Sequence, residues 1–321
     1  MAEELAVGAA IGSFLTMMSG INPVSKGVGK LIGMASEQIG YRIQSTNNVI
    51  RAKADAEIRL IEVRTEIIVD TLQAAALNEA KIASIYAVDG IAVARENVSL
   101  NRRQRHFEQI VLKAAIELSS TPDSAVNDTK VDDDWTNQFF SYAQDIGNEE
   151  LQFLWAKLLA SELKRPGMIS RRTLDVVKTL TRDNCETFTT LCTYVWHCES
   201  IRETLVILNT DWIGQLGSPV GIQLTDLLLL MDGGLVENLS TYDDYGIKHS
   251  ANSFNYFGSH YLFRSEHEPR RNMRQNAGKF QLTAPGKEIS KVVAGKPDPI
   301  YLNHIVEYYQ SRGWLVALEQ S

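Results

Sequence analysis

Three cysteines and a histidine gather within one short segment, and their side chains are the usual ligands of a structural zinc ion. They are Cys185, Cys192, His197 and Cys198. No two of the cysteines have the Cys-x-x-Cys spacing of a zinc ribbon or finger. On one predicted helix over 183–198, Cys185 and Cys192 share a face because they are seven residues apart, whereas Cys198 points elsewhere. We therefore expect buried, reduced thiols and no metal site.

A second candidate for metal chemistry is the run of carboxylates at Asp132, Asp133 and Asp134. It lies immediately before an apolar-periodic segment that begins at Trp135, where acidic side chains cap free amides and face the positive end of the helix dipole. This position favours a helix cap over a metal site. The chain also lacks the Gly-x-x-x-x-Gly-Lys loop of phosphate-binding enzymes and the Gly-x-Ser-x-Gly turn of hydrolases. We predict a protein that is not an enzyme and needs no cofactor.

Five basic residues lie close together toward the C-terminal end of the chain, where they would attract phosphates. They are Arg264, Arg270, Arg271, Arg274 and Lys279. Two interpretations stay open, a nucleic-acid-binding surface and a solvated charged loop. The net charge of −7 means that bulk charge does not draw the chain onto nucleic acid, so any such binding would depend on this local cluster.

The segment around these residues predicts an α+β domain over 199–321. An apolar helix over 222–231 ends at Gly233-Gly234, and Thr283-Ala284-Pro285-Gly286 opens another helix. Apolar or alternating runs predict short strands at 205–208, 235–238, 256–263 and 279–283. This order resembles a winged-helix module with a long, basic wing from 239 to 279. The resemblance implies that the domain binds either nucleic acid or protein.

The first 34 residues form a glycine-rich, nearly uncharged segment that differs from the rest of the chain. Neither of its two apolar pieces reaches the roughly 20 residues that a membrane-spanning helix needs. Each piece contains a Gly-x-x-x-Gly spacing, Gly8 with Gly12 and Gly29 with Gly33, which lets helices approach closely. The segment is therefore a membrane-active tip, a helical hairpin packed inside an oligomer, or a disordered start.

Residues 35–118 predict a long helix, because no proline occurs between Pro23 and Pro122 and good helix formers predominate. A partial heptad repeat indicates a coiled coil that joins copies of the chain. The predicted oligomer contacts are Ile58, Ile61, Ile68, Leu72 and Ile82. One continuous rod and a hairpin that turns near Asp89-Gly90 are both open.

A polar segment over 119–134 predicts a linker, and residues 132–198 predict a compact helical core domain. The expected fold is thus mainly α, with a long N-terminal helix or coiled-coil hairpin, a central helical bundle and a C-terminal α+β winged-helix-like domain. Three cysteines and no N-terminal secretory signal predict a cytoplasmic protein, peripheral at the inner membrane if the N-terminal segment acts there.

The core segment carries a family resemblance over about residues 132–196. Its features are Asp134-Trp135, Phe139-Phe140, the run from Gly147-Asn148-Glu149-Glu150 through Gln152 and Trp155, Pro166-Gly167, and Ser170 with Arg172-Thr173-Leu174. This pattern resembles a bacterial family of unknown function and is similar to the abortive-infection group called Abi-alpha. The resemblance implies a cytoplasmic bacterial protein in antiphage defence, and it brings no catalytic residues.

Together these features predict a non-enzymatic, oligomeric helical scaffold or effector. In this hypothesis a signal reaches the C-terminal domain, the assembly rearranges, and the N-terminal segment acts on the membrane. The alternative is a nucleic-acid-binding regulator that uses the basic wing.

Overall fold

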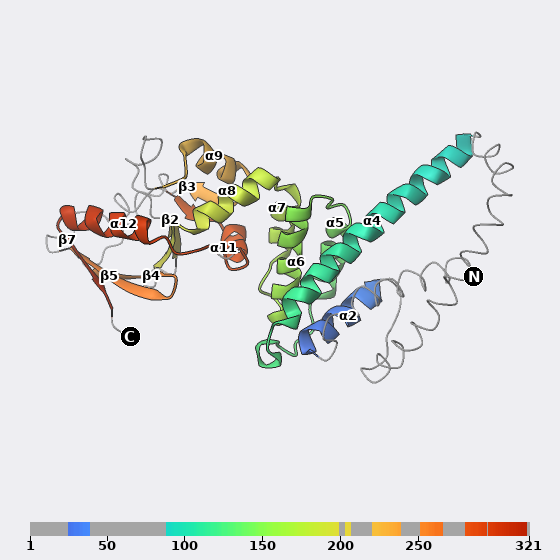
Figure 1. Cartoon of the computed structure of the whole chain (residues 1–321), viewed down its shortest axis with the longest axis horizontal. Helices are drawn as coiled ribbons and strands as arrows, with labels where there is room; N and C mark the ends of the chain where they lie inside the picture. Colours follow the sequence, from blue (N-terminus) through green and yellow to red (C-terminus); the bar gives the residue numbers. More distant parts are fainter. Residues whose placement is uncertain are drawn as a thin grey trace. The chain divides into compact units, whose positions relative to one another are not determined.

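The computed structural model of the chain describes residues 25–38, 88–198, 203–206, 220–238, 251–265, 280–293 and 295–319. The chain divides into two compact units, residues 1–168 and 169–321 (Figure 1). The described part is mostly helical and has an antiparallel sheet in the second unit, which confirms the expected fold class at this coarse level. The boundary falls inside the segment 132–198 that we predicted as one helical domain.

Helices build the described part of the first unit. They are α2 (Lys26–Gln38), α4 (Val88–Ser119), the 3₁₀ turn η2 (Asp123–Ala125), α5 (Asp133–Ala143) and α6 (Glu149–Lys164). The Asp132 carboxylate accepts a hydrogen bond from the backbone N–H of Trp135 at 2.8 Å, so the predicted cap of α5 is confirmed. Asn148 caps α6 in the same way, accepting from the N–H of Leu151 at 3.0 Å.

The core of this unit is aromatic. The ring of Phe139 stacks on Trp135, with 5.1 Å between centroids, and lies 5.2 Å from the ring of Trp155. Gln152 of α6 is buried and joins two elements: its Oε1 accepts from Nζ of Lys113, and its Nε2 donates to the carbonyl oxygen of Ile146. Asn148, Gln152 and Trp155 belong to the pattern that carries the family resemblance, and all three have structural roles in the bundle.

Residues 119–134 connect two helices of the same unit, so the prediction that they form an interdomain linker is wrong. Val126 and Val131 are buried, and the N–H of Asn127 donates to the carbonyl oxygen of Lys164 at 2.9 Å. Most of the other side chains in this segment are exposed. Its polar composition reflects that exposure, while the two valines anchor it.

Helix α2 packs against α4, α5 and α6 through one apolar face. The buried residues on this face are Val28, Leu31, Ile32 and Ala35. The Lys30 ammonium donates to the carbonyl oxygens of Asn127, Thr129 and Leu163 at 2.9, 2.8 and 3.4 Å. Burial lowers the pKa of Lys30. These contacts hold α2 on the helical bundle.

The long helix predicted over 35–118 lies partly outside the described residues. Its C-terminal part is α4, which extends beyond α5 and α6 in Figure 1. Asp89 and Gly90 are helical, so they do not form the turn of the hairpin that we considered. The predicted oligomer contacts Ile58, Ile61, Ile68, Leu72 and Ile82 all lie outside the described residues.

The described part of the second unit combines helices with a seven-stranded antiparallel sheet of order β3-β6-β2-β1-β4-β5-β7. Its elements are α7 (Arg171–Thr179), α8 (Arg182–Cys192), β1 (Val195–Cys198), β2 (Glu203–Val206), α9 (Leu224–Asp232), β3 (Val236–Asn238), β4 (Ala251–Tyr256), β5 (Ser259–Ser265), β6 (Phe280–Leu282), α11 (Ala284–Ser290), α12 (Pro299–Ser311) and β7 (Trp314–Leu318).

The two ends of this sheet bury opposite faces. Trp196 of β1 is fully buried, and its side chain lies on one face of the sheet. On that face α12 packs, with the ring of Tyr309 at 5.2 Å from that of Phe263. Val206 of β2 pairs with Val195, the neighbour of Trp196, so it points to the opposite face, and it is also fully buried. The sheet therefore carries one core under α12 and a second core at its β3-β6-β2 end.

Two sequence predictions are corrected here. The helix predicted over 183–198 ends at Cys192, and Val195–Cys198 forms strand β1 in the centre of the sheet. The strand predicted over 256–263 is a hairpin, because Phe257 and Gly258 form a turn between β4 and β5. Both turn residues have positive φ, 48° and 85°, as a type I′ turn requires.

The described part of the predicted wing belongs to the sheet and does not form a projecting loop. Residues 251–265 form β4 and β5, which pair with β1 and β7 and extend the sheet. The prediction of one long wing from 239 to 279 is therefore wrong for these residues. The rest of that segment lies outside the described residues.

Candidate interaction surface

The structure places only some of the residues that the sequence singled out. Arg264 is exposed on β5, whereas Arg270, Arg271, Arg274 and Lys279 lie outside the described residues. Gly29 and Gly33 are on the exposed side of α2, with no atom within 4 Å of a β-carbon built on either, and Gly8 and Gly12 lie outside the described residues. In α2 it is Gly27 that faces another helix, since its β-carbon would lie 3.0 Å from Cδ2 of Leu118.

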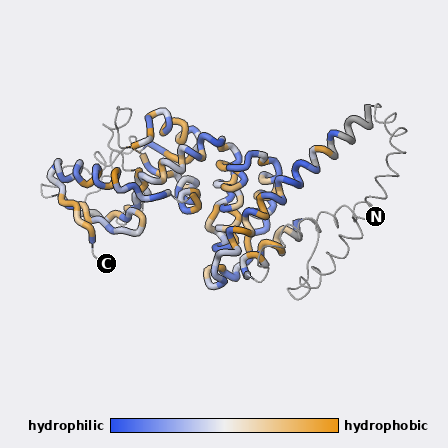
Figure 2. The backbone as a smooth tube through the Cα atoms, viewed as in Figure 1, coloured by the Kyte–Doolittle hydropathy of each residue, from blue (hydrophilic) through white to orange (hydrophobic). Residues whose placement is uncertain are grey.

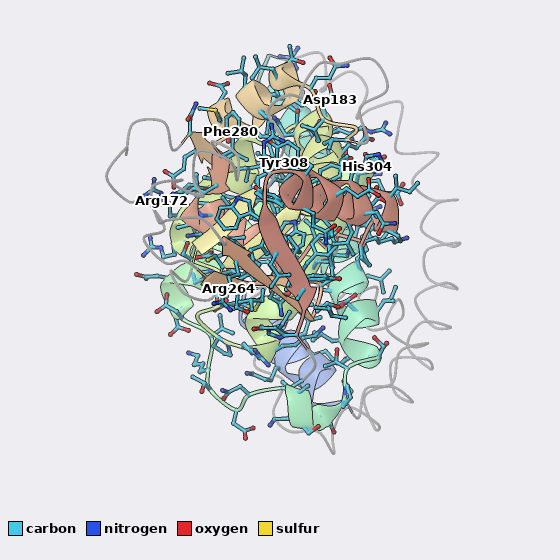
Figure 3. All side chains as sticks on the ribbon, turned by 90° about the vertical axis from the view of Figure 1, so that its left-hand side faces the viewer. Arg172, Asp183, Arg264, Phe280, His304 and Tyr308 are labelled. Atoms are coloured by element: carbon cyan, nitrogen blue, oxygen red, sulfur yellow. The ribbon has the colours of Figure 1, made fainter. Side chains whose placement is uncertain are left out.

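Arg264 projects from the sheet face opposite α12. Its neighbour Phe263 is buried beneath α12, and consecutive strand residues point to opposite faces. In Figure 3 it is labelled well below Tyr308 and His304, which belong to α12. Its cross-strand partner is Leu315 of β7. The other four residues of the predicted basic cluster lie outside the described residues, so the cluster stays a prediction.

Helix α9 presents a different surface, made of leucines. The helix has nine residues, and three of its leucines are exposed: Leu224 by 51%, Leu228 by 54% and Leu229 by 39%. Leu224 and Leu228 are four residues apart and share a face, and Leu229 lies beside Leu228. The opposite side of the helix is used for packing, with Leu227 and Leu230 fully buried. We call the exposed set Leu224, Leu228 and Leu229 the α9 leucine face.

Both ends of α9 are fixed by hydrogen bonds. At the start, the N–H of Gln223 donates to the Asp226 carboxylate at 2.8 Å. At the end, the N–H of Leu235 donates to the Leu230 carbonyl at 2.9 Å and that of Gly234 to Met231 at 3.0 Å. This is a Schellman motif, and Gly234 has the positive φ of 71° that it needs. The Gly-Gly pair predicted as a helix end thus turns the chain from α9 directly into β3.

Helix α11 secures the same junction. The Thr283 hydroxyl donates to the carbonyl oxygen of Gly234 at 2.6 Å. The N–H of Thr283 donates to the carbonyl oxygen of Leu235 at 3.1 Å. The Thr283 oxygen also accepts from the N–H of Gly286 at 3.1 Å and caps α11. A β-carbon on Gly286 would overlap the carbonyl oxygen of Leu235. These contacts fix the position of the end of α9 against β3 and α11 in the structure.

The charge of α9 is unsuited to phosphate. The helix contains no basic residue, and its charged side chains are Asp226 and Asp232. Lys and Arg supply most of the attraction of proteins for nucleic acid. An apolar face flanked by carboxylates instead fits an apolar protein surface with basic residues at its rim.

The three cysteines are in the thiol form; Cys192 and Cys198 are buried, as the sequence predicted, whereas Cys185 is half-buried. Burial raises the pKa of Cys192 to about 12. Among the described residues there is no group of three or more His, Cys, Asp or Glu side chains placed to hold a metal ion. Cys198 and His197 are neighbours on strand β1 and therefore point to opposite faces of the sheet.

Sequence reasoning predicted α9 but not its exposed leucines. The signal was present in the run Leu227-Leu228-Leu229-Leu230, because four consecutive apolar residues cover every side of a helix. A short helix on a small sheet buries only one side, so part of such a run must face outward. Which leucines are exposed depends on where β3 and α8 pack, and no local pattern gives that information.

Among the described residues, no helix is both long and apolar enough to cross a membrane. A family model described as "Protein of unknown function (DUF2806)" matches residues 92–306, which is more than half of the chain and includes α9. The match confirms the expectation of a family of unknown function, over a longer segment than 132–196, and it makes no connection with Abi-alpha. No curated protein and no solved structure matches the chain.

Proposed function

This chain belongs to the DUF2806 family of proteins of unknown function, and we propose that it is a non-enzymatic scaffold whose second unit binds a partner protein through the α9 leucine face. The observation that carries this proposal is the exposure of Leu224, Leu228 and Leu229 on α9. Exposed apolar side chains gathered on one surface are typical of protein-interaction sites. The partner would offer an apolar surface bordered by basic residues that face Asp226 and Asp232.

The arrangement around α9 supports a winged-helix-like reading of this part of the unit. Strand β6 lies between β2 and β3, and α9 leads directly into β3. In winged-helix modules that bind DNA, the helix at this place enters the major groove with polar and basic side chains. Here the same helix offers leucines and aspartates. The comparison supports a winged-helix-like module used for protein binding.

The nucleic-acid-binding alternative rests on the basic residues between 264 and 279. Arg264 is exposed on the open sheet face, which is the one described observation in its favour. The nucleic-acid-binding alternative predicts salt-dependent binding to DNA or RNA that weakens when Arg270, Arg271 and Arg274 are replaced by alanine. Binding that survives nuclease treatment and is lost with the α9 leucines would instead support the scaffold.

Co-purification of the full-length chain with its partner tests the proposal. The test variant is Leu224→Ser with Leu228→Ser, and the control is Ile300→Ser, which changes a residue of α12 that is 64% exposed. We expect one partner protein to co-purify in constant proportion with the wild type and with the control. The amount that co-purifies with the double variant should be at least tenfold lower. Equal recovery with all three chains would contradict the proposal.

We propose that the cellular role of the protein is antiphage defence, which depends on α9 and on the N-terminal segment. This proposal rests on the resemblance to abortive-infection proteins. Plating efficiency of phage on bacteria that express the chain measures this role. Protection should disappear both with the double serine variant and with deletion of residues 1–34. Co-sedimentation of the wild type and this deletion with anionic vesicles then tests the proposed peripheral membrane contact.

A further inference from the structure

Strand β7 forms one edge of the sheet, and among the described residues its only partner is β5. The N–H of Glu319 donates to the carbonyl oxygen of His260 at 2.8 Å. This bond shows which residues of β7 are hydrogen-bonded to β5. Bonded and non-bonded pairs alternate in an antiparallel ladder. Leu315 and Ala317 therefore direct their backbone groups toward β5, whereas Trp314, Val316 and Leu318 direct theirs outward.

This edge lacks the features that usually prevent strands from joining. The sequence Trp-Leu-Val-Ala-Leu contains no charged residue and no proline, and its ladder with β5 has no bulge. Leu315 and Leu318 are 46% and 59% exposed. Figure 2 shows β7 as a hydrophobic segment. The opposite edge, β3, has three residues and carries the exposed Glu237. Of the two edges, β7 is the one suited to accept another strand.

We propose that β7 pairs with β7 of a second copy of the chain, antiparallel and about a two-fold axis at Val316. The sheet then continues from one copy into the other. In this register Trp314 lies opposite Leu318 of the second copy, and Leu315 lies opposite Ala317. Each outward N–H and carbonyl of Trp314, Val316 and Leu318 meets its counterpart, and both exposed leucines gain apolar neighbours. The strand is self-complementary in this register because Trp314 faces Leu318, Leu315 faces the small Ala317, and Val316 faces its own copy.

Charge supports the same register. With Val316 on the axis, the turn at Arg312 and Gly313, which comes just before the strand, lies next to the end of the second copy's strand at Glu319. Arg312 is exposed and lies 3.7 Å above the ring of Tyr308. Glu319 is exposed and accepts a hydrogen bond from the Ser253 hydroxyl at 2.8 Å. The two-fold axis creates this opposite-charge pair twice. Sliding the strands by two residues would separate the charges and leave outward backbone groups unpaired.

The solution mass of the full-length chain tests this interface. The variant Leu315→Lys with Leu318→Lys puts two cations on the edge, and the control Ile300→Lys with Asn303→Lys adds the same charge to exposed positions of α12. We expect the mass of the edge variant to be half that of the wild type and of the control. Equal masses for all three chains would overturn the proposal, as would growth of the mass with concentration, which indicates open-ended pairing.

A disulfide test checks the register itself. Residues 315 and 317 of the two copies are directly opposite each other, whereas two copies of residue 315 have Cα atoms about 8 Å apart, too far for a disulfide. A mixture of Leu315→Cys and Ala317→Cys chains should therefore form a disulfide-linked dimer upon mild oxidation, and Leu315→Cys chains alone should not. Equal crosslinking in both samples would overturn this register. The proposal is independent of α9, because the edge variant keeps the α9 leucine face and its co-purifying partner.

Discussion

Gly286 of α11 lies against the carbonyl group of Leu235, so closely that the position has no room for a β-carbon. This contact joins the start of α11 to the end of α9 and the beginning of β3. The backbone of Gly286 fixes where a β-carbon would lie, and the atom that it would meet is the backbone carbonyl oxygen of Leu235, so a rotamer change cannot relieve the overlap. The orientation of the α9 leucine face therefore depends on a glycine about 60 residues away in the sequence.

Replacing Gly286 by alanine should destabilise the second unit by about 3 kcal/mol, since the new methyl group forces the backbone of α11 away from β3. Urea unfolding of the full-length chain measures the change. Gly221→Ala is the matched control, because the atom nearest to its β-carbon is the Tyr194 hydroxyl at 3.8 Å. A loss at Gly286 no larger than that at Gly221 would show that the junction does not hold α9.

Gly29→Ala and Gly33→Ala test the predicted glycine contact of α2. Both residues are in open space, so alanine should raise stability by about 0.5–1 kcal/mol through helix propensity alone. Thermal unfolding, solution mass and vesicle binding are measured together. A fall in mass or in vesicle binding with either alanine would mean that these glycines pack closely against another molecule.

Lys30 and Lys26 allow a comparison of two lysines on one helix. Lys30→Met removes an ammonium that three carbonyl oxygens surround, and we expect a loss of about 2 kcal/mol and faster proteolysis of α2. Lys26→Met removes an ion pair with Asp128, whose side chain is largely exposed, and should cost much less stability than Lys30→Met. Equal effects would argue that α2 is held by its apolar face alone.

The stability of the second unit should fall at alkaline pH. Burial raises the pKa of Cys192 to about 12 from an ordinary value of 9.0, so the folded chain keeps a proton that the unfolded chain releases above pH 9. Burial also raises the pKa of Tyr256 to about 12. Unfolding then releases protons between about pH 9 and 12, and the free energy of unfolding decreases by about 1.4 kcal/mol per pH unit for each proton.

Urea titrations at pH 8, 9 and 10 measure this slope. Cys192→Ala should make the decrease between pH 9 and 10 shallower, whereas Cys185→Ala, at a half-buried position on the same helix, serves as the control. A slope that is identical in the two variants would show that the Cys192 thiol is not protected by folding.

Local signals in the sequence predicted several elements correctly. The cap at Asp132, the helix end at Gly233-Gly234 and the cap at Thr283 depend on residues within a few positions of each other. The errors concern long-range pairing. Val195–Cys198 continues the apolar pattern of α8, yet pairing with β2 and β4 makes it a strand. The hairpin of β4 and β5 was predicted as one strand because Phe257 looks like a strand residue, although it occupies a turn with positive φ.

The candidate surface was less accessible to sequence reasoning than the fold. Basic residues are easily recognised in a sequence, whereas the sequence does not show whether a given leucine is exposed or buried. Leu227 and Leu228 are neighbours, and only the packing of α9 on its unit buries the first and exposes the second. For the same reason β7 could not be identified as an edge of the described sheet before its pairing with β5 was known.

Site-specific photocrosslinking at residue 228 tests the central claim most directly. A benzophenone amino acid replaces Leu228 in one chain and Ile300 in another, and both are irradiated in living bacteria that express the full-length protein. The account predicts one nuclease-resistant protein adduct from position 228, which Leu224→Ser abolishes and which position 300 does not give. An adduct that nuclease removes, or the same adducts from both positions, would contradict it.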